Sequence, residues 1–194
     1  YSVVSPFTFL GIEKFQELVR KYSLEIDEKP IDLVGKVFPA TGGVPVPKRH
    51  PSRLKYRLLE IERAGKQLNQ NINKQPKFFP PSDPHKPALF AIATIRNGLS
   101  LDFSKAILDK LWSKEQDISL DSTLKDVCNT LNLNFGDIKK LSESDEVKNN
   151  YLMNSQEAIN KDVFGAPSFV LNDEVFWGQD SLDSLEYKIK TLLM

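Results

Sequence analysis

Apolar positions in the first part of the chain predict a strand, a helix and a second strand. Residues 1–4 form a short apolar run of the buried-strand type. Ser5 is a favoured N-cap and Pro6 a favoured first helical residue, and apolar side chains then recur at helical spacing over 9–22. Residues 24–33 alternate well enough for a second strand. The pattern therefore predicts a β-α-β unit.

The middle of the chain is predicted to be a helical block. It begins after a loop rich in proline and glycine at 38–51, and a second such loop lies at 78–87. Long loops without regular structure are uncommon and are often functional. Apolar spacing predicts six helices, at 52–71, 87–97, 102–114, 121–131, 136–141 and 145–161.

The last part of the chain is predicted to be a β-hairpin followed by a helix. Residues 168–171 and 175–177 have strand character on either side of an Asn-Asp turn. Asp180 or Ser181 would cap a final helix, whose apolar face would carry Leu182, Leu185, Ile189 and Leu192.

Together these elements indicate an α/β thioredoxin-like fold, β-α-β … β-β-α, with a large all-helical domain inserted in its middle. We expect the thioredoxin-like domain to comprise 1–50 and 162–194, and the inserted helical domain to comprise 51–161. The apolar N-terminus is typical of the tail of a strand rather than a signal peptide. We therefore expect a few further residues to precede Tyr1.

Composition narrows the range of functions. The 26 basic and 26 acidic residues balance, which argues against a nucleic-acid binder. No apolar run approaches the roughly 20 residues that span a bilayer, so we expect no membrane association. Cys128 is the only cysteine, and the two histidines lack ligand spacing, so we predict no disulfide and no metal. We expect a reducing compartment: the cytoplasm, or a mitochondrion or peroxisome in a eukaryote.

Two distant segments carry candidate chemistry. Ala166 precedes Pro167, which holds it extended, and such prolines are often cis. A proline of this kind lies beside the active centre of thioredoxin-type folds. Residues 5–8, Ser-Pro-Phe-Thr, occupy the place where such a fold carries two redox cysteines. The site is therefore predicted to lack dithiol redox chemistry.

Four stretches of the sequence carry a resemblance to a known family. The chain resembles the branch of the DsbA-like superfamily that contains 2-hydroxychromene-2-carboxylate isomerases and kappa-class glutathione transferases. The resemblance covers nearly the whole chain in order, and its last two stretches together are specific. The stretches are 4–11, 38–43, 163–169 and 176–183.

The resemblance implies glutathione as cofactor and assigns roles to residues of this chain. Ser5 would contact the glutathione sulfur, and Ala166, beside Pro167, would pair with the tripeptide through its backbone. Gln179 and Asp180 would hold the γ-glutamyl end, and a basic residue before Tyr56, best matched by Arg53, would bind the glycyl carboxylate.

The chain departs from the family pattern in three places, one of which is Phe79-Pro80-Pro81-Ser82, where many members have Phe-Pro-x-Asn. Gly43 stands where many members have asparagine, and Ser181 where many have arginine.

The residues alone leave simpler interpretations open. Ser5 is equally consistent with an N-cap, Asp180 is also a good cap, and the basic segment 48–57 is either a solvated helix start or an anion pocket. A helix N-terminus lowers the pKa of a bound thiol, because its free N–H groups favour an anion. Ser5 would add a hydroxyl donor to that thiolate.

The leading hypothesis is a glutathione-dependent isomerase acting on an aromatic or conjugated carboxylate, with Ser5 as the catalytic residue. The alternatives are a kappa-like glutathione transferase or peroxidase acting on an electrophile, and a non-catalytic DsbA-like binding protein. The expected partners are a small-molecule substrate and a second copy of the chain, as a homodimer.

Overall fold

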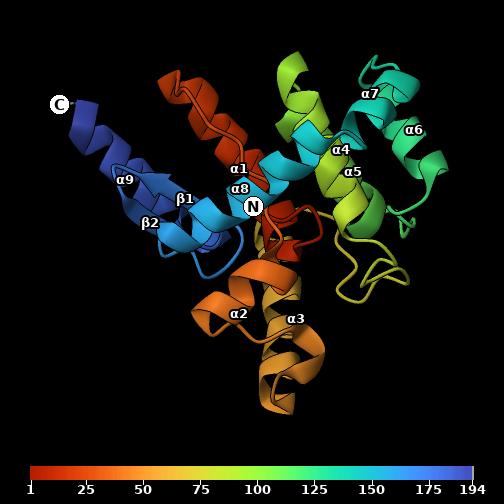
Figure 1. Ribbon diagram of the computed structural model, residues 1–194. Coiled ribbons are helices and arrows are strands. Elements are labelled where there is room, and N and C mark those ends of the chain that lie inside the picture. Colours follow the sequence, from red (N-terminus) through yellow and green to blue (C-terminus); the bar gives the residue numbers. More distant parts are fainter. Residues whose placement is uncertain (194) are drawn as a thin grey trace.

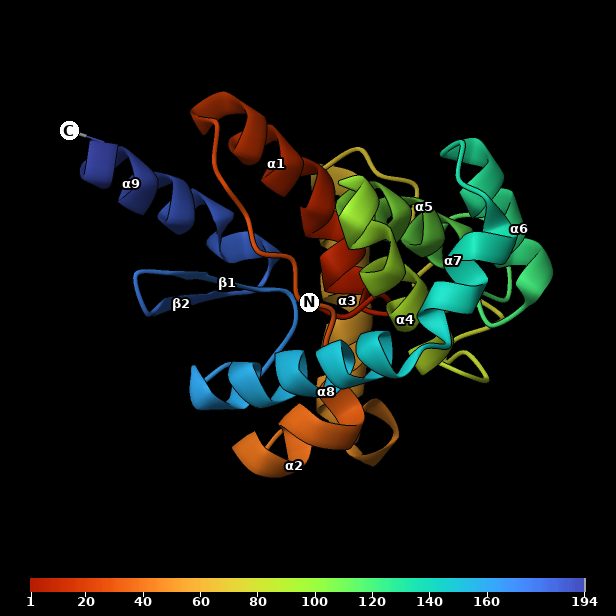
Figure 2. The same cartoon turned by 45° about the horizontal axis from the view of Figure 1, so that its top comes forward.

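The computed structural model describes residues 1–193, and helices make up most of it (Figures 1 and 2). Helix α1, Pro6–Tyr22, begins where the sequence predicts it. The Ser5 hydroxyl accepts a hydrogen bond from the N–H of Thr8 at 3.3 Å, so Ser5 is an N-cap. Burial of Phe9 and Ile12, which are three positions apart, confirms the helical spacing.

The predicted helical block is confirmed, with boundaries that move by a few residues. Its helices pack around the largest hydrophobic core, in which Phe90, Phe103 and Trp112 are almost fully buried. The two-turn helix near residue 136 is present as predicted. The helices are α3 Pro51–Gln67, α4 His85–Thr94, α5 Ser100–Trp112, α6 Asp121–Thr130, α7 Phe135–Ser142 and α8 Asp145–Asn160.

The predicted C-terminal hairpin is confirmed. Strand β1, Ser168–Leu171, pairs antiparallel with β2, Glu174–Trp177. The two turn residues between them, Asn172 and Asp173, both have positive φ (50° and 63°), which matches the right-handed twist of the strands.

The final helix, α9, spans Leu182–Leu193 and lies beside the hairpin and α1 (Figure 1). Three of the four residues expected on its apolar face are buried: Leu182, Leu185 and Ile189. The prediction was wrong for Leu192, which is 51% exposed because it lies near the helix end, beyond the small core under the hairpin.

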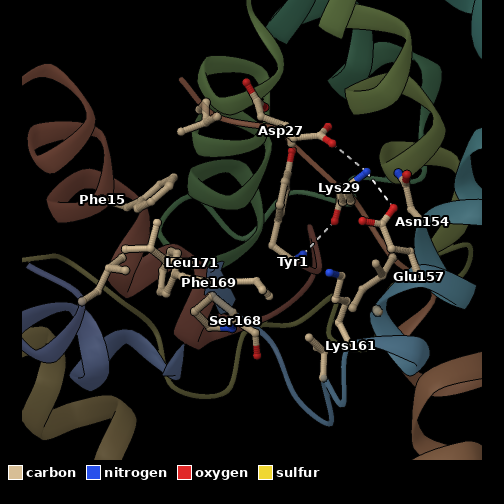
Figure 3. Close-up of a pocket in the computed structure, with 18 of the residues that line it drawn as sticks. Tyr1, Phe15, Asp27, Lys29, Asn154, Glu157, Lys161, Ser168, Phe169 and Leu171 are labelled. Carbon is tan, nitrogen blue, oxygen red and sulfur yellow. Dashed lines mark hydrogen bonds and ion pairs between the residues drawn. The ribbon is translucent and has the colours of Figure 1, made fainter. Parts of the chain in front are cut away.

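The two other predicted strands, 1–4 and 24–33, do not form as regular strands. Only one bridge joins them: the Tyr1 amino group donates to the Lys29 carbonyl at 2.8 Å, and the Ile31 N–H donates to the Tyr1 carbonyl at 2.9 Å. A groove of about 480 Å³ separates 24–29 from β1 (Figure 3). Because the groove keeps 24–29 and β1 apart, their main chains do not pair. The sheet therefore has two strands, β1 and β2.

The predicted loop at 38–51 contains short helices instead. A π-helical turn at Leu33–Val37 leads into α2, Phe38–Thr41, and a 3₁₀ turn follows at Val46–Lys48. The Asp32 carboxylate accepts from the Gly35 N–H at 2.8 Å and so stabilises the first of these turns. Local capping of this kind is hard to predict from a segment rich in proline and glycine.

Candidate active site

The start of α1 meets the segment before β1. The Ser5 hydroxyl donates to the Ala166 carbonyl at 3.2 Å, although the two residues are 161 positions apart. The Ala166–Pro167 peptide bond is cis, and Ser5 and Ala166 are 8% and 7% exposed. The structure therefore brings together the two segments that the sequence singled out.

The helix start beside this contact offers donors for an anion. Pro6 has no N–H, and Thr8 donates its N–H to the Ser5 hydroxyl. Among residues 1–193, no acceptor binds the N–H of Phe7 or of Ala166. An open N–H on the first turn of a 17-residue helix, aided by the helix dipole, stabilises a negative charge.

The turn after β2 is held against both partners of the site. The Gly178 N–H donates to the Pro167 carbonyl at 2.9 Å. Gly11 of α1 lets the same turn approach closely, because a Cβ at Gly11 would lie 2.9 Å from the Gln179 Cβ. Gln179 is therefore fixed against α1, in the 3₁₀ turn Gln179–Ser181.

Asp180 has an open carboxylate. It is exposed, and within the described residues its side chain makes no hydrogen bond or ion pair. The Ser181 hydroxyl donates to the Gly178 carbonyl at 2.8 Å. The alternative in which Asp180 acts as a helix cap therefore finds no support in the side-chain contacts.

Arg53 is placed differently from the other candidates. It is exposed on the first turn of α3, where its N–H donates to the His50 carbonyl at 2.9 Å. No hydrogen bond or ion pair in the described chain links its side chain to Ser5, Ala166 or Asp180. The structure thus unites the candidates from α1 and the C-terminal segment, and leaves Arg53 on a separate element.

The departure from the family pattern at Gly43 has a physical basis. The Gly43 N–H closes the turn on the Phe38 carbonyl at 3.0 Å, and a Cβ at Gly43 would lie 2.1 Å from the Phe38 ring. An asparagine therefore cannot occupy position 43 in this conformation.

Cys128 takes no part in the site. Its side chain is fully buried in the core of the helical block, and burial raises the pKa of its thiol to about 11. Cys128 therefore stays protonated at neutral pH, which confirms its interpretation as a small core residue.

Sequence reasoning missed Arg57, which lies one helical turn beyond Arg53. Arg57 is 8% exposed and is the one charged residue among the buried residues of 1–193. The signal was present: Arg53 and Arg57 are four positions apart in the same predicted helix and so lie on one side of it.

The groove of about 480 Å³ borders the site, and its lining includes neither Ser5 nor Ala166. Thr8, Pro167 and Ser168 are among its lining residues on the side of the site. Figure 3 shows its other end, where the Lys29 ammonium lies between Asp27 and Glu157, at 2.8 and 2.9 Å. The groove therefore separates the irregular segment 24–29 from strand β1.

The fold and this site define a class: a thioredoxin-fold protein in which Ser5 and Thr8, at the start of α1, lie beside a cis-proline. A family model described as the DSBA-like thioredoxin domain matches residues 1–190. The chain therefore belongs to the DsbA-like thioredoxin domain family.

Similar proteins narrow the class further. The chain is 25% identical over 186 residues to a 2-hydroxychromene-2-carboxylate isomerase of Sphingobium xenophagum, covering 96% of this chain and 93% of that protein. It is 24% identical over 195 residues to one from Pseudomonas putida, covering 96% and 90%. These relatives are named isomerases, which supports an enzymatic role for this chain.

Solved structures show the same fold. The structure of a 2-hydroxychromene-2-carboxylate isomerase superposes with a TM-score of 0.85 at 22% identity, covering all of this chain and 93% of that one. The cytosolic disulfide reductase DsbM from Pseudomonas aeruginosa with GSH superposes with a TM-score of 0.64 at 12% identity, covering 100% of this chain and 96% of that one.

Within residues 1–193, none of the helices has the length and the apolar character that a membrane span requires.

Proposed function

We propose that this protein is a glutathione-dependent isomerase of the 2-hydroxychromene-2-carboxylate isomerase type, acting on an aromatic or conjugated carboxylate. The observation that carries the proposal is the contact of the Ser5 hydroxyl with the Ala166 carbonyl, at the open start of α1. The site has donors for a thiolate and no cysteine of its own, so the thiol would come from a bound cofactor.

The chain's own polar groups suit such a cofactor. The Phe7 N–H and the Ser5 hydroxyl are donors at the helix start, and the Ala166 N–H is open for an extended peptide. The carboxylate of Asp180 is free to accept from an ammonium group, as a γ-glutamyl end would require. When bound, glutathione would supply a thiolate that adds to the conjugated substrate and leaves after bond rotation.

Ser5 would act by exchanging one acceptor for another. A hydroxyl has a single proton and can donate one hydrogen bond, which Ser5 donates to the Ala166 carbonyl. To stabilise a thiolate, Ser5 must rotate and direct that proton at the sulfur, while its oxygen continues to accept from Thr8. The Phe7 N–H and the helix dipole would lower the thiol pKa further.

Support for the isomerase reaction comes from the names of the relatives, which cover nearly the whole chain at 24–25% identity. Support for glutathione comes from the donor set and from the DsbM structure, which has the same fold and is described with GSH. The homodimer and the reducing compartment stay predictions.

Ser5→Ala tests the proposal, and Ser144→Ala is its matched control. Ser144 caps α8 as Ser5 caps α1: each hydroxyl accepts an N–H at 3.3 Å and donates to a carbonyl. Each variant should lose about 1 kcal/mol of stability through the lost cap. Only Ser5→Ala should raise the pKa of bound glutathione thiol, followed by thiolate absorbance, and lower the turnover of 2-hydroxychromene-2-carboxylate.

The outcomes separate the alternatives. If both variants leave the thiol pKa and the turnover unchanged, the Ser5 hydroxyl is only an N-cap. If calorimetry shows that the wild-type protein binds no glutathione, the cofactor proposal is wrong. The result would favour the alternative of a non-catalytic binding protein. Turnover of electrophiles by glutathione conjugation, without isomerisation, would favour the transferase.

A further inference from the structure

Arg57 is a buried cation without an anionic partner. It is 8% exposed, and within residues 1–193 its side chain makes no ion pair and no hydrogen bond. The acids of the same helix are engaged elsewhere, since Glu60 pairs with Arg63 and Glu62 with two lysines. Burying an unpaired charge is costly, so its retention calls for a compensating interaction.

Two aromatic rings lie close to this charge. The guanidinium carbon of Arg57 lies 5.2 Å from the centre of the Phe79 ring and 6.0 Å from that of Trp112. The two rings pack against each other at 4.9 Å. Such contacts use the face of the planar guanidinium and leave the N–H donors along its edge free for a planar anion.

The guanidinium also remains reachable. The fully enclosed polar atoms without partners include the Nε1 of Trp112 but none of the Arg57 nitrogens. The unpaired nitrogens of Arg57 therefore each keep some solvent-accessible surface. The guanidinium edge thus has solvent-accessible nitrogen atoms available to an anion.

Neighbouring cations add to the positive potential around Arg57. Burial, and then the charge of Arg49, lowers the pKa of Arg57 to about 10. Burial, and then the charge of Arg53, lowers the pKa of Arg49. No carboxylate within the described residues pairs with any of the three. Because like charges repel, an anion bound among them relieves both the repulsion and the cost of burial.

The position of Arg57 relates it to the start of α1. Phe7, on the first turn of α1, and Phe79, beneath the guanidinium, pack against the same core, which includes Trp112. Figure 2 shows α3 next to α2 and behind the start of α1. Arg57 thus lies on a helix of the helical block that contacts α1, the helix with the proposed thiolate site at its start.

From this geometry we infer that Arg57, reinforced by Arg49, binds the carboxylate of a planar aromatic or conjugated substrate. The inference rests on the proposed function and adds to it the residue that selects a carboxylate. Arg53, exposed one turn earlier, is the better placed of the two for a solvated glycyl carboxylate. Arg57, among aromatic rings, provides an apolar surrounding in which an aromatic acid is bound and an inorganic anion is not favoured.

Calorimetry with a non-reactive pair of ligands tests this inference. Chromone-2-carboxylate carries the planar acid, and chromone-2-carboxamide has the same shape without the charge. The wild-type protein should bind the carboxylate at least about tenfold more tightly than the carboxamide, because a charge-assisted bidentate contact is lost.

Variants assign that preference to Arg57. Arg57→Met should abolish the discrimination, and Arg57→Lys should retain part of it, since it keeps the charge and loses the fork. Arg63→Met is the control, because Arg63 lies on the same helix and pairs with Glu60 at 3.1 Å in an exposed position. It should bind both ligands as the wild type does.

Several results would overturn the inference. They are equal affinity of the wild type for the two ligands, no binding of either, or unchanged discrimination in folded Arg57→Met. Weaker binding of glutathione with unchanged binding of the carboxylate would assign Arg57 to the tripeptide instead. If Arg57→Met does not fold, Arg57→Gln provides the same comparison with a polar side chain.

The outcome is distinguishable from that of the proposed function. Discrimination that depends on Arg57, in a protein that neither binds glutathione nor turns over the chromene, would leave the carboxylate site standing and remove the isomerase. Turnover without any dependence of carboxylate binding on Arg57 would do the reverse.

Discussion

The helical block and the sheet half of this protein differ in how completely they bury their interiors. In the block, Phe103, Leu108 and Trp112 are fully enclosed in a continuous core. In the sheet half, two short strands cover two small clusters, and Phe169 of β1 lines a groove of about 480 Å³. The rigid support of the site therefore comes from the block, while Ala166, Gln179 and Asp180 come from the less completely packed sheet half.

Helix α1 joins the two regions. Its first half, with Phe9 and Ile12, belongs to the large core, and Leu18 in its second half belongs to the small one. Ser5 at its start is therefore held by the better packed region while it contacts Ala166 from the other. A site at such a junction combines a fixed helix end with a segment that is free to accept a ligand.

The largest expected effect tests the difference in packing. Trp112→Ala should cost about 3–5 kcal/mol in free energy of unfolding, because it opens a large cavity in a closed core. Phe169→Ala should cost clearly less, since Phe169 is only partly buried and already faces the groove. Urea denaturation of both variants measures the two values.

A matched variant separates volume from polarity at the same position. Trp112→Phe keeps an aromatic ring and removes the buried Nε1–H, which has no acceptor among the described residues. It should lose much less stability than Trp112→Ala. Equal losses for Trp112→Ala and Phe169→Ala would contradict the comparison, because the two halves would then be packed alike.

The second effect falls in the sheet half and concerns binding rather than stability. Asp180→Ala should weaken glutathione binding about tenfold or more, because a charge-assisted hydrogen bond contributes roughly 1.5–3 kcal/mol. Asp183→Ala is the control: Asp183 is also exposed nearby, but it pairs with Lys14 at 2.5 Å. Calorimetry should show normal affinity for the control.

A different result would reassign Asp180. If Asp180→Ala lowers the melting temperature and leaves the glutathione affinity untouched, the carboxylate serves the fold. The open carboxylate of the sheet half would then be structural, and the division of roles between the two halves would fail at that point.

How much of this structure the sequence predicts differs between the two halves. Helical spacing, the Ser5 cap and the turn at Asn172 are local signals, so the helices and the hairpin follow from neighbouring residues. Whether segments 1–4 and 24–33 form strands depends on partners far along the chain. Only the bridge at Tyr1 joins them, so their alternating sequence pattern alone does not determine strand pairing.

The candidate site shows the same division. The proline and the serine could be recognised as parts of one site because their residue types are restrictive. The close approach of Gly11 to Gln179 and the burial of Arg57 arise from tertiary packing, which a single sequence does not reveal. Arg53 was chosen by its place in a motif, and the structure leaves its side chain without a partner in the site.

The third effect tests how firmly the junction holds the turn after β2. Gly11→Ala should cost about 1–3 kcal/mol, because the new methyl group would lie 2.9 Å from the Gln179 Cβ and 3.3 Å from its Cα. Displacing that turn should also weaken glutathione binding. The control is Gly136→Ala in α7, whose nearest contact is the Asn134 Oδ1 at 3.2 Å, and it should be close to neutral in both measurements.

A stabilising result would be informative as well. Alanine is favoured over glycine inside a helix, so Gly11→Ala would stabilise the protein if the turn could move away freely. Increased stability with unchanged glutathione affinity would show that the turn is not held against α1.

The smallest effect is a dependence of stability on pH, at Glu28 beside the groove. Its Oε2 is buried without a partner in the described chain, and burial raises the pKa of this carboxyl. A raised pKa means that the folded state holds a proton more tightly than the unfolded state. Stability is therefore greatest below the ordinary pKa of glutamate and falls as the pH rises through the raised value.

Glu28→Gln should remove this dependence and slightly stabilise the protein at neutral pH, because the amide keeps the shape and carries no charge to bury. Thermal unfolding from pH 4 to pH 8 measures it, with the exposed Glu25→Gln as the control from the same segment. A smaller loss of stability on acidification in Glu28→Gln than in the wild type would show the opposite sign. Glu28 would then be stabilised as a carboxylate, and its buried oxygen would not be a weakness of the sheet half relative to the helical block.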